Sequence, residues 1–272
     1  MSHEFLYLFI AGLIGGFIAG LVGIGGGVVY VFIIPISLVY IGVPQNEIVQ
    51  YTIANSIFAI FFASASANYM LIRLKLFYRK EVLIISLSAI ISSLLTLYFI
   101  VNTTWYSLHL FNVTIVLLLL YMLFTTLRSA KKVFVFPLDS LKKWKLGMVG
   151  MAGGSIAALS GLGGGIVIIP ILNSFMKIDI RKASSISSGV IMVTALVMTT
   201  YNLFENPVHE FKAYNMGYII FPIALTISLG VVLASPFGVR IGRRLTSSTI
   251  SYIYAGFLII VIFKKIAELI HW

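Results

Sequence analysis

Two glycine runs in this sequence could bind an anion through the peptide backbone. Residues 23–27 read Gly-Ile-Gly-Gly-Gly and residues 161–165 read Gly-Leu-Gly-Gly-Gly, and both runs lie within long apolar stretches. Glycine disfavours helix by about 1 kcal/mol per position relative to alanine, so both runs are predicted to break helices. A broken helix presents unpaired amides and the positive end of its dipole, which together attract an anion. Because glycine has no side chain, a ligand can approach this backbone closely.

Hydroxyl and amide side chains that follow each run could donate further hydrogen bonds. Asn55 and Ser56 follow the first run, and Ser187 and Ser188 follow the second. Neutral donors can hold an oxyanion without a buried cation. These residues have a second interpretation, since asparagine also links membrane helices and serine is a common small residue within them. The predicted substrate-binding residues are Gly23, Gly25, Gly26, Gly27, Asn55, Ser56, Gly161, Gly163, Gly164, Gly165, Ser187 and Ser188.

Groups that serve other chemistries are missing from the middle of the apolar stretches. All eight acidic residues, together with the lysine, arginine and histidine residues, lie in or near loops and ends. Their positions argue against a proton pump built on carboxylates and against a divalent-metal transporter. The sequence also has no cysteine and no P-loop. We therefore expect no enzyme activity, no metal, no cofactor and no direct use of ATP.

The elements that must position the glycine runs are membrane-spanning helices. Of the 272 residues, 60% are hydrophobic and only 10% are charged, whereas soluble domains carry roughly 25% charged residues. Apolar segments long enough to cross a bilayer core of about 30 Å recur along the chain. The sequence therefore predicts an all-α polytopic membrane protein, with apolar segments at 5–40, 48–72, 82–101, 107–127, 146–176, 183–204, 217–239 and 247–263.

The two glycine runs belong to an internal duplication. Eight residues in and around the first run recur unchanged 138 positions later, and each half of the chain holds four apolar segments. A proline, Pro35 or Pro170, follows each run. We predict a first membrane repeat at 1–128, a basic cytoplasmic linker at 129–145 and a second membrane repeat at 146–272. Matching helix breaks in two repeats are typical of the binding site of a secondary transporter.

The basic residues predict how the segments are oriented. Lysine and arginine cluster in the loops at 73–80, 128–145, 177–182 and 240–244, and the other loops carry almost none. The positive-inside rule places these clusters in the cytoplasm, so the net charge of +11 reflects orientation and not nucleic-acid binding. Segment 146–176 then starts and ends on one side, as a hairpin with its glycines at the tip. The halves become inverted repeats, each a glycine-broken helical hairpin plus three transmembrane helices. If each broken segment instead crosses the membrane once, the repeats are parallel.

Three motifs of this sequence resemble the TauE/SafE family of sulfite exporters, also called the sulfonate uptake permease family. They are the run Gly-Leu-Gly-Gly-Gly-Ile-Val-Ile-Ile-Pro at 161–170, its counterpart in the first half, and Gly-Val-Arg-Ile-Gly-Arg-Arg-Leu at 238–245. The resemblance covers essentially the whole chain. It implies a bacterial or archaeal permease of the cytoplasmic membrane that moves sulfite, sulfoacetate or other organosulfonates. The first half departs from the family pattern, because seven residues, and not four, separate its glycines from Pro35.

These observations lead to one principal hypothesis for function. We expect a secondary transporter that carries a small anion, a sulfur oxyanion or a sulfonate, across the cell membrane by alternating access. A passive anion channel that uses the same glycines is the alternative. The expected partners are the anionic substrate and the lipid bilayer, and a homo-oligomer is compatible with the sequence.

Overall fold

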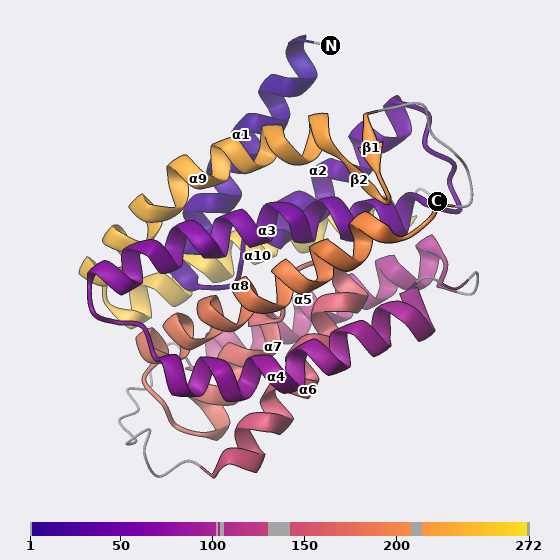
Figure 1. The fold of residues 1–272 in the computed structure, drawn as a ribbon. Coiled ribbons are helices and arrows are strands. Elements are labelled where there is room, and N and C mark those ends of the chain that lie inside the picture. The colour runs from indigo at the N-terminus through magenta and orange to yellow at the C-terminus, as the bar shows by residue number, and fades with distance from the viewer. Residues whose placement is uncertain (1, 102, 104–105, 130–141, 208–213, 271–272) are drawn as a thin grey trace.

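The computed structural model describes residues 2–101, 103, 106–129, 142–207 and 214–270, and most of them are helical (Figure 1). Within these ranges, six helices are long and apolar enough to cross a membrane, which confirms the predicted all-α polytopic membrane protein. The elements in chain order are α1 (Ser2–Val22), α2 (Gly27–Tyr40), α3 (Ile48–Arg73), α4 (Arg79–Thr96), the π-helix η1 (Leu97–Val101), α5 (Leu108–Ser129), α6 (Lys143–Ser160), α7 (Gly165–Pro170), the π-helix η3 (Ile171–Phe175), α8 (Ile180–Phe204), β1 (Asn215–Met216), β2 (Ile219–Ile220), α9 (Phe221–Arg244) and α10 (Ser247–Ile270).

Both glycine runs interrupt helices, as predicted. α1 ends at Val22 and α2 begins at Gly27, while α6 ends at Ser160 and α7 begins at Gly165. Each long glycine-containing segment is therefore a pair of helical arms joined by a short break. We refer to α1 and α2 as hairpin 1, and to α6, α7 and η3 as hairpin 2.

The second arm of each hairpin folds back against the first. A side chain at Gly26 would clash with the carbonyl oxygen of Gly15, and one at Gly164 would clash with the carbonyl oxygen of Gly153. The second pair of residues lies 138 positions after the first. The duplication found in the sequence is therefore also present in the backbone contacts at the two breaks.

Each hairpin also packs against a helix from the other half of the chain. α1 runs along α9, where any side chain at Gly20 would meet the carbonyl oxygen of Ser235. α6 runs along α4, where a side chain at Gly154 would meet the carbonyl oxygen of Ala89. Small residues permit this approach of backbones, and the resulting van der Waals contact holds helices together in lipid. Each half of the chain therefore packs a helix against the hairpin of the other half, and we call these two packings the exchanged contacts.

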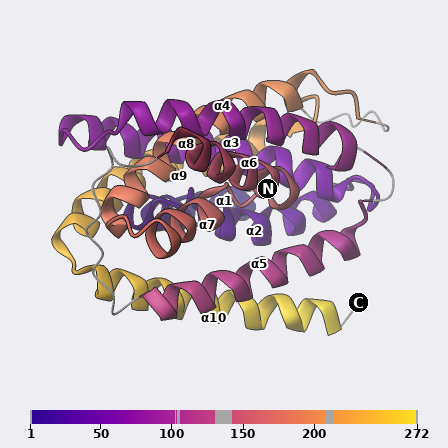
Figure 2. The same cartoon turned by 90° about the horizontal axis from the view of Figure 1, so that it is seen from below.

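The helices α3 and α8 lie at the centre of the bundle and run antiparallel to each other. Asn68, near the end of α3, donates a hydrogen bond to Ser188, near the start of α8. Ile60 and Ile191, from the middle of the two helices, both lie against Gly25. α5 and α10 pack on each other in an outer layer (Figure 2). The glycine breaks therefore lie about half-way along the central helices.

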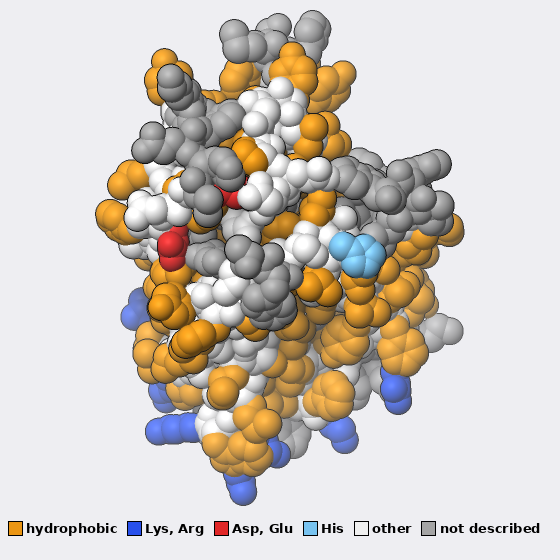
Figure 3. All heavy atoms as spheres, turned by 90° about the vertical axis from the view of Figure 1, so that its right-hand side faces the viewer, with side chains coloured by type: hydrophobic (Ala, Val, Ile, Leu, Met, Phe, Trp, Pro, Cys, Tyr) orange, Lys and Arg blue, Asp and Glu red, His pale blue; other side chains and the backbone are white. Residues whose placement is uncertain are grey.

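Lysine and arginine side chains gather at one end of the bundle. In Figure 3 they lie at the lower end of the face in view, below a band of hydrophobic side chains, and the acidic side chains lie higher. We refer to the end of the bundle that holds Arg181 and Arg243 as the basic end. Arg243 donates a hydrogen bond to the carbonyl oxygen of Arg181 and lies close enough to Tyr78 and Asp179 to interact electrostatically with both. The starts of α4 and α8 are therefore at the basic end, together with the end of α9.

Hairpin 2 starts and ends at the basic end. α6 runs parallel to α4, because Gly150 and Gly154 contact successive turns of that helix, so both helices start there. η3 leads back to Asp179, which caps α8 at the same end. This is the path that the hairpin interpretation predicts. The orientation of the two halves relative to a membrane stays a prediction.

A short β-hairpin replaces the start of one predicted helix. The apolar segment at 217–239 is not helical throughout, because β1 and β2 pair as antiparallel strands and α9 begins only at Phe221. Gly217 turns the chain between the strands with a φ of +56°, and the side chain of Asn55 accepts a hydrogen bond from the amide of Ile220. Backbone groups outside a helix need such partners when they are buried.

The predicted division into two repeats and a linker stays a prediction. Residues 130–141 of the predicted linker 129–145 lie outside the described part of the chain. α6 begins at Lys143, so the last residues assigned to the linker belong to a helix.

Candidate functional site

The candidate site begins with the backbone of the two breaks. All residues at 23–27 and 161–165 are buried. In the first break, Gly25 has a φ of +93°, and in the second, Gly163 has a φ of +82°. Residues with a side chain rarely adopt this left-handed conformation, so the sequence needs glycine here to leave the helix.

The two breaks touch each other at the centre of the bundle. A Cβ at Gly27 would lie 2.7 Å from the Cα of Leu162, and a Cβ at Gly165 would lie 2.9 Å from the Cα of Ile24. The two contacts are equivalent under the 138-residue offset, so each break contacts the other in the same way. The fold therefore brings together the predicted site glycines of both halves, as a binding site formed by both halves requires.

Two serines connect each break to the central helix of the other half. Ser56 on α3 donates a hydrogen bond of 2.6 Å to the carbonyl oxygen of Gly161. Ser187 on α8 donates one of 3.1 Å to the carbonyl oxygen of Gly23. These carbonyls lie directly after the ends of α6 and α1, where helix carbonyls have lost their usual partners. Both predicted serines are thus at the breaks, where they bind protein carbonyls.

A tyrosine supports the second break from the side. The hydroxyl of Tyr106 donates a hydrogen bond of 2.7 Å to the carbonyl oxygen of Leu159, two residues before the break begins. Burial raises the pKa of Tyr106 to about 12. The hydroxyl therefore remains a donor over the whole physiological pH range.

Several backbone amides at the breaks have no hydrogen-bond acceptor. The amides of Ile24, Gly25, Gly26, Gly163 and Gly164 donate no hydrogen bond within the described part of the chain. Unpaired buried amides are rare in proteins, and each one costs about 1–3 kcal/mol. Donors from both halves are thus available in one small region.

The other two predicted side chains lie away from the contact between the breaks. Asn55 donates hydrogen bonds to the carbonyl oxygens of Tyr51, at 2.7 Å, and Tyr218, at 2.9 Å, and it accepts one from Ile220. Its amide therefore fixes the β-hairpin to α3. Ser188 accepts a hydrogen bond of 3.2 Å from Asn68 and lines a small cavity beside Gly23. Contact of either side chain with a substrate stays a prediction.

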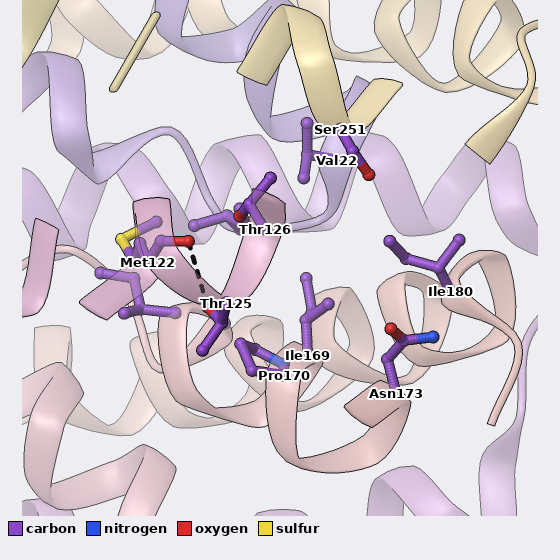
Figure 4. A pocket seen from close by; sticks show the side chains of 12 residues that line it. Val22, Met122, Thr125, Thr126, Ile169, Pro170, Asn173, Ile180 and Ser251 are labelled. Atoms are coloured by element: carbon purple, nitrogen blue, oxygen red, sulfur yellow. Dashed lines mark hydrogen bonds between the residues drawn. The ribbon is translucent and has the colours of Figure 1, made fainter. Parts of the chain in front are cut away.

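One cavity of about 40 Å³ lies between hairpin 2 and the outer layer (Figure 4). It reaches Ile24 and Gly165 at the breaks. Its polar lining comes from Thr125, Thr126, Asn173 and Ser251, which sequence reasoning missed. Asn173 gives the clearest sequence signal, because it is an amide within an apolar segment. In the structure its side chain is almost fully buried. The volume suits a few water molecules at most.

A second cavity of about 30 Å³ extends from Gly23 toward the basic end. Ser184 and Ser188 line it, together with Arg181 and Arg243. Both cavities lie on the basic side of the breaks, and both are too small for a sulfur oxyanion. The structure thus has the two breaks packed together, with narrow spaces leading from them toward one end of the bundle.

The fold and the site define a class of protein. A polytopic helical bundle in which the helix breaks of two duplicated halves meet at the centre is the architecture of a membrane transporter.

Comparison with known proteins gives the family. Residues 8–264 match the family described as sulfite exporter TauE/SafE, and the chain belongs to this family. It is 29% identical over 256 residues to a probable membrane transporter protein of Methanocaldococcus jannaschii, covering 90% of this chain and 91% of that protein. It is 26% identical over 260 residues to a probable membrane transporter protein of Haemophilus influenzae, covering 94% and 96%. No solved structure matches the chain. The predicted resemblance is confirmed, and the family and relatives indicate a transporter and not an enzyme.

Proposed function

We propose that this protein is a secondary transporter that moves sulfite or an organosulfonate across the cell membrane by alternating access. The substrate binds between the glycine breaks at 23–27 and 161–165. Its negatively charged oxygens accept hydrogen bonds from backbone amides, and no buried cation is required there.

The unpaired amides at the breaks carry this proposal. They come from both halves of the chain, and no acceptor in the described part of the chain satisfies them, so a solute or water can supply one. An oxyanion with three oxygens accepts several such hydrogen bonds at once. Hydrogen bonds from neutral donors are weak enough individually to release the anion again, which transport requires.

Binding requires the two hairpins to separate. A Cβ at Gly27 would lie 2.7 Å from Leu162, so the breaks leave no space for a solute in this conformation. Each hairpin is held by a helix of the other half, α1 by α9 and α6 by α4. The units that can move without breaking these contacts are hairpin 1 with α9 and hairpin 2 with α4. Movement of one unit against the other changes the distance between the breaks, and we assign the conformation described here to a closed intermediate.

The same exchanged contacts support an inverted arrangement of the repeats. α3 and α8 are antiparallel partners, and Ser56 and Ser187 reach across to the opposite break in equivalent ways. A two-fold axis that relates antiparallel helices lies across them, in the plane of a membrane. We place the basic end in the cytoplasm by the positive-inside rule.

The proposal is tested by transport of labelled sulfite and sulfoacetate into proteoliposomes. Gly163→Leu should lower the initial rate at least ten-fold, because its side chain fills the break 3.1 Å from the Ile24 carbonyl oxygen. Gly147→Leu is the matched control, since nothing lies within 4 Å of a Cβ at that position. Gly163→Ala, a smaller change at the same φ, covers the case in which the leucine variant does not fold.

Three results would count against parts of the proposal. If a folded Gly163→Leu protein transports at the wild-type rate, the glycine breaks do not form the substrate site. If the wild-type protein transports none of the sulfur anions, the proposed substrate class is wrong. Single-channel currents far above the turnover of a carrier favour the channel alternative.

A further inference from the structure

The closing motif of the sequence, at 238–245, contributes a charged residue that the proposed site does not use. We propose that Arg243 of this motif and Arg181 of α8 form an anion-binding subsite between the basic end and the first glycine break. The subsite takes a small oxyanion such as sulfite or a sulfonate. This inference rests on the proposed function for its role in transport, but the binding itself can be tested alone.

Arg181 and Arg243 meet at the start of α8, close enough for their charges to interact. Arg243 donates from Nη2 to the carbonyl oxygen of Arg181 at 3.5 Å and also to the hydroxyl of Ser185. Arg181 donates from Nη2 to the carbonyl oxygen of Leu245 at 2.7 Å. The sequence separation of these residues is about 60 positions, so the fold itself brings the two cations together.

Their positive charges are not balanced by a bound carboxylate. The hydrogen-bond acceptors of both guanidinium groups in the described part of the chain are carbonyl and hydroxyl oxygens. Asp179 is near, but its carboxylate accepts hydrogen bonds from the amides of Arg181 and Lys182 as the cap of α8. Two neighbouring cations that are partly removed from water repel each other, and a bound anion relieves this repulsion.

One donor of the pair is unused. The Nε of Arg181 is buried and has no hydrogen-bond partner among the described residues. A guanidinium group binds an oxyanion most strongly through two parallel N–H groups, and Nε with one Nη forms such a pair. The unused Nε therefore marks where the first oxygen of an anion binds.

The cavity beside these residues connects them to the proposed transport site. Arg181 and Arg243 line it at the basic end, Ser184 and Ser188 line its wall, and Gly23 of the first break closes it. Hydroxyl groups thus lead from the cations to the break without any acidic side chain in the lining. The cavity is too small for the anion in this conformation, so binding at the arginines requires it to widen, as binding at the breaks requires the hairpins to separate.

A purely structural role for the pair makes different predictions. In that case the arginines only hold the end of α9 to the start of α8, through Leu245 and Ser185. Their loss then lowers thermal stability and the amount of folded transporter, and leaves the KM of the folded fraction unchanged. A binding role changes KM and anion-dependent stabilisation.

The test compares Arg243→Gln with Arg244→Gln in proteoliposomes. Arg244 is the next residue of the same helix, carries the same charge and is exposed. We expect Arg243→Gln to raise the KM for sulfite about ten-fold, as for loss of one charge-assisted hydrogen bond, with kcat changed less than two-fold. Arg243→Lys keeps the charge without the paired N–H groups, so its KM should lie between those of the wild type and Arg243→Gln. Equal KM values for the wild type and Arg243→Gln overturn the subsite.

A binding measurement separates this inference from the proposed function. Sulfite, and sulfate as a second probe, should raise the thermal midpoint of the wild type and Arg244→Gln in detergent, and raise that of Arg243→Gln much less. If the wild type transports no sulfur anion but shows this pattern, the subsite stands and the proposed function fails. If neither anion stabilises the wild type more than Arg243→Gln, the subsite is wrong, whatever the transport result. If Arg243→Gln does not fold, the same comparison is made with Arg243→Lys and Arg181→Lys.

Discussion

Replacing Ser56 or Ser187 with alanine should destabilise the protein by about 1–2 kcal/mol each. Each serine donates the only hydrogen bond found to a buried carbonyl just after a helix end, Gly161 or Gly23, in the described part of the chain. Hydrogen bonds between membrane helices average roughly 0.6 kcal/mol, with a maximum near 1.7. A buried carbonyl that loses its donor costs about 1–3 kcal/mol. The second effect dominates here because no alternative donor is in place, so the cost lies above the average.

The assay is reversible unfolding in mixed micelles with increasing denaturing detergent. Each single variant should shift the folding equilibrium constant about ten-fold, since 1.4 kcal/mol corresponds to a factor of ten. The double variant should lose roughly the sum if the two serines act independently. Thr200→Ala on α8 is the control, because its hydroxyl is exposed and binds only Leu196 of its own helix. If the serine variants unfold at the same detergent fraction as this control, the two hydrogen bonds do not stabilise the breaks.

Two further predictions concern packing and pH. Gly20→Leu should prevent folding or lower the yield of folded protein severely, because its side chain meets the Ser235 backbone, whereas Gly147→Leu should not; size-exclusion chromatography separates the outcomes. Burial raises the pKa of Tyr106 to about 12 from the usual tyrosine value of 10.0. The unfolded chain therefore loses this proton first, and stability falls as the pH rises from 10 to 12. Tyr106→Phe should lose less stability than the wild type over that interval, and an equal loss would contradict the assignment.

The features that depend on short stretches of sequence could be predicted. A run of glycines disfavours helix wherever it occurs, so the breaks at 23–27 and 161–165 followed from local energetics alone. The helical segments followed from apolar length, and the shared end of hairpin 2 followed from the positions of basic residues. The start of α9 was missed because the apolar residues at 217–220 look alike in a helix or a strand.

The contacts between the halves could not be predicted in the same way. Ser56 and Ser187 are equally good donors for a substrate and for a carbonyl, and their partners lie 105 and 164 positions away. Asn55 similarly binds backbone at 218 and 220, which only the folded bundle brings near. The pairing of Arg181 with Arg243 was hidden because each arginine, taken alone, looks like a signal for membrane orientation. A single sequence does not reveal which residues far apart in the chain lie close together in the fold.

The packing of α1 on α9 has a consequence for synthesis of the protein. α9 follows α1 by about 200 residues, which at 5–20 residues per second takes roughly 10–40 s to translate. Throughout that interval the glycine-lined face of the first helix is in the bilayer without the surface that covers it. Assembly is therefore completed late and from the carboxyl-terminal side, and ribosomes that stop early release chains whose first helix has no native neighbour.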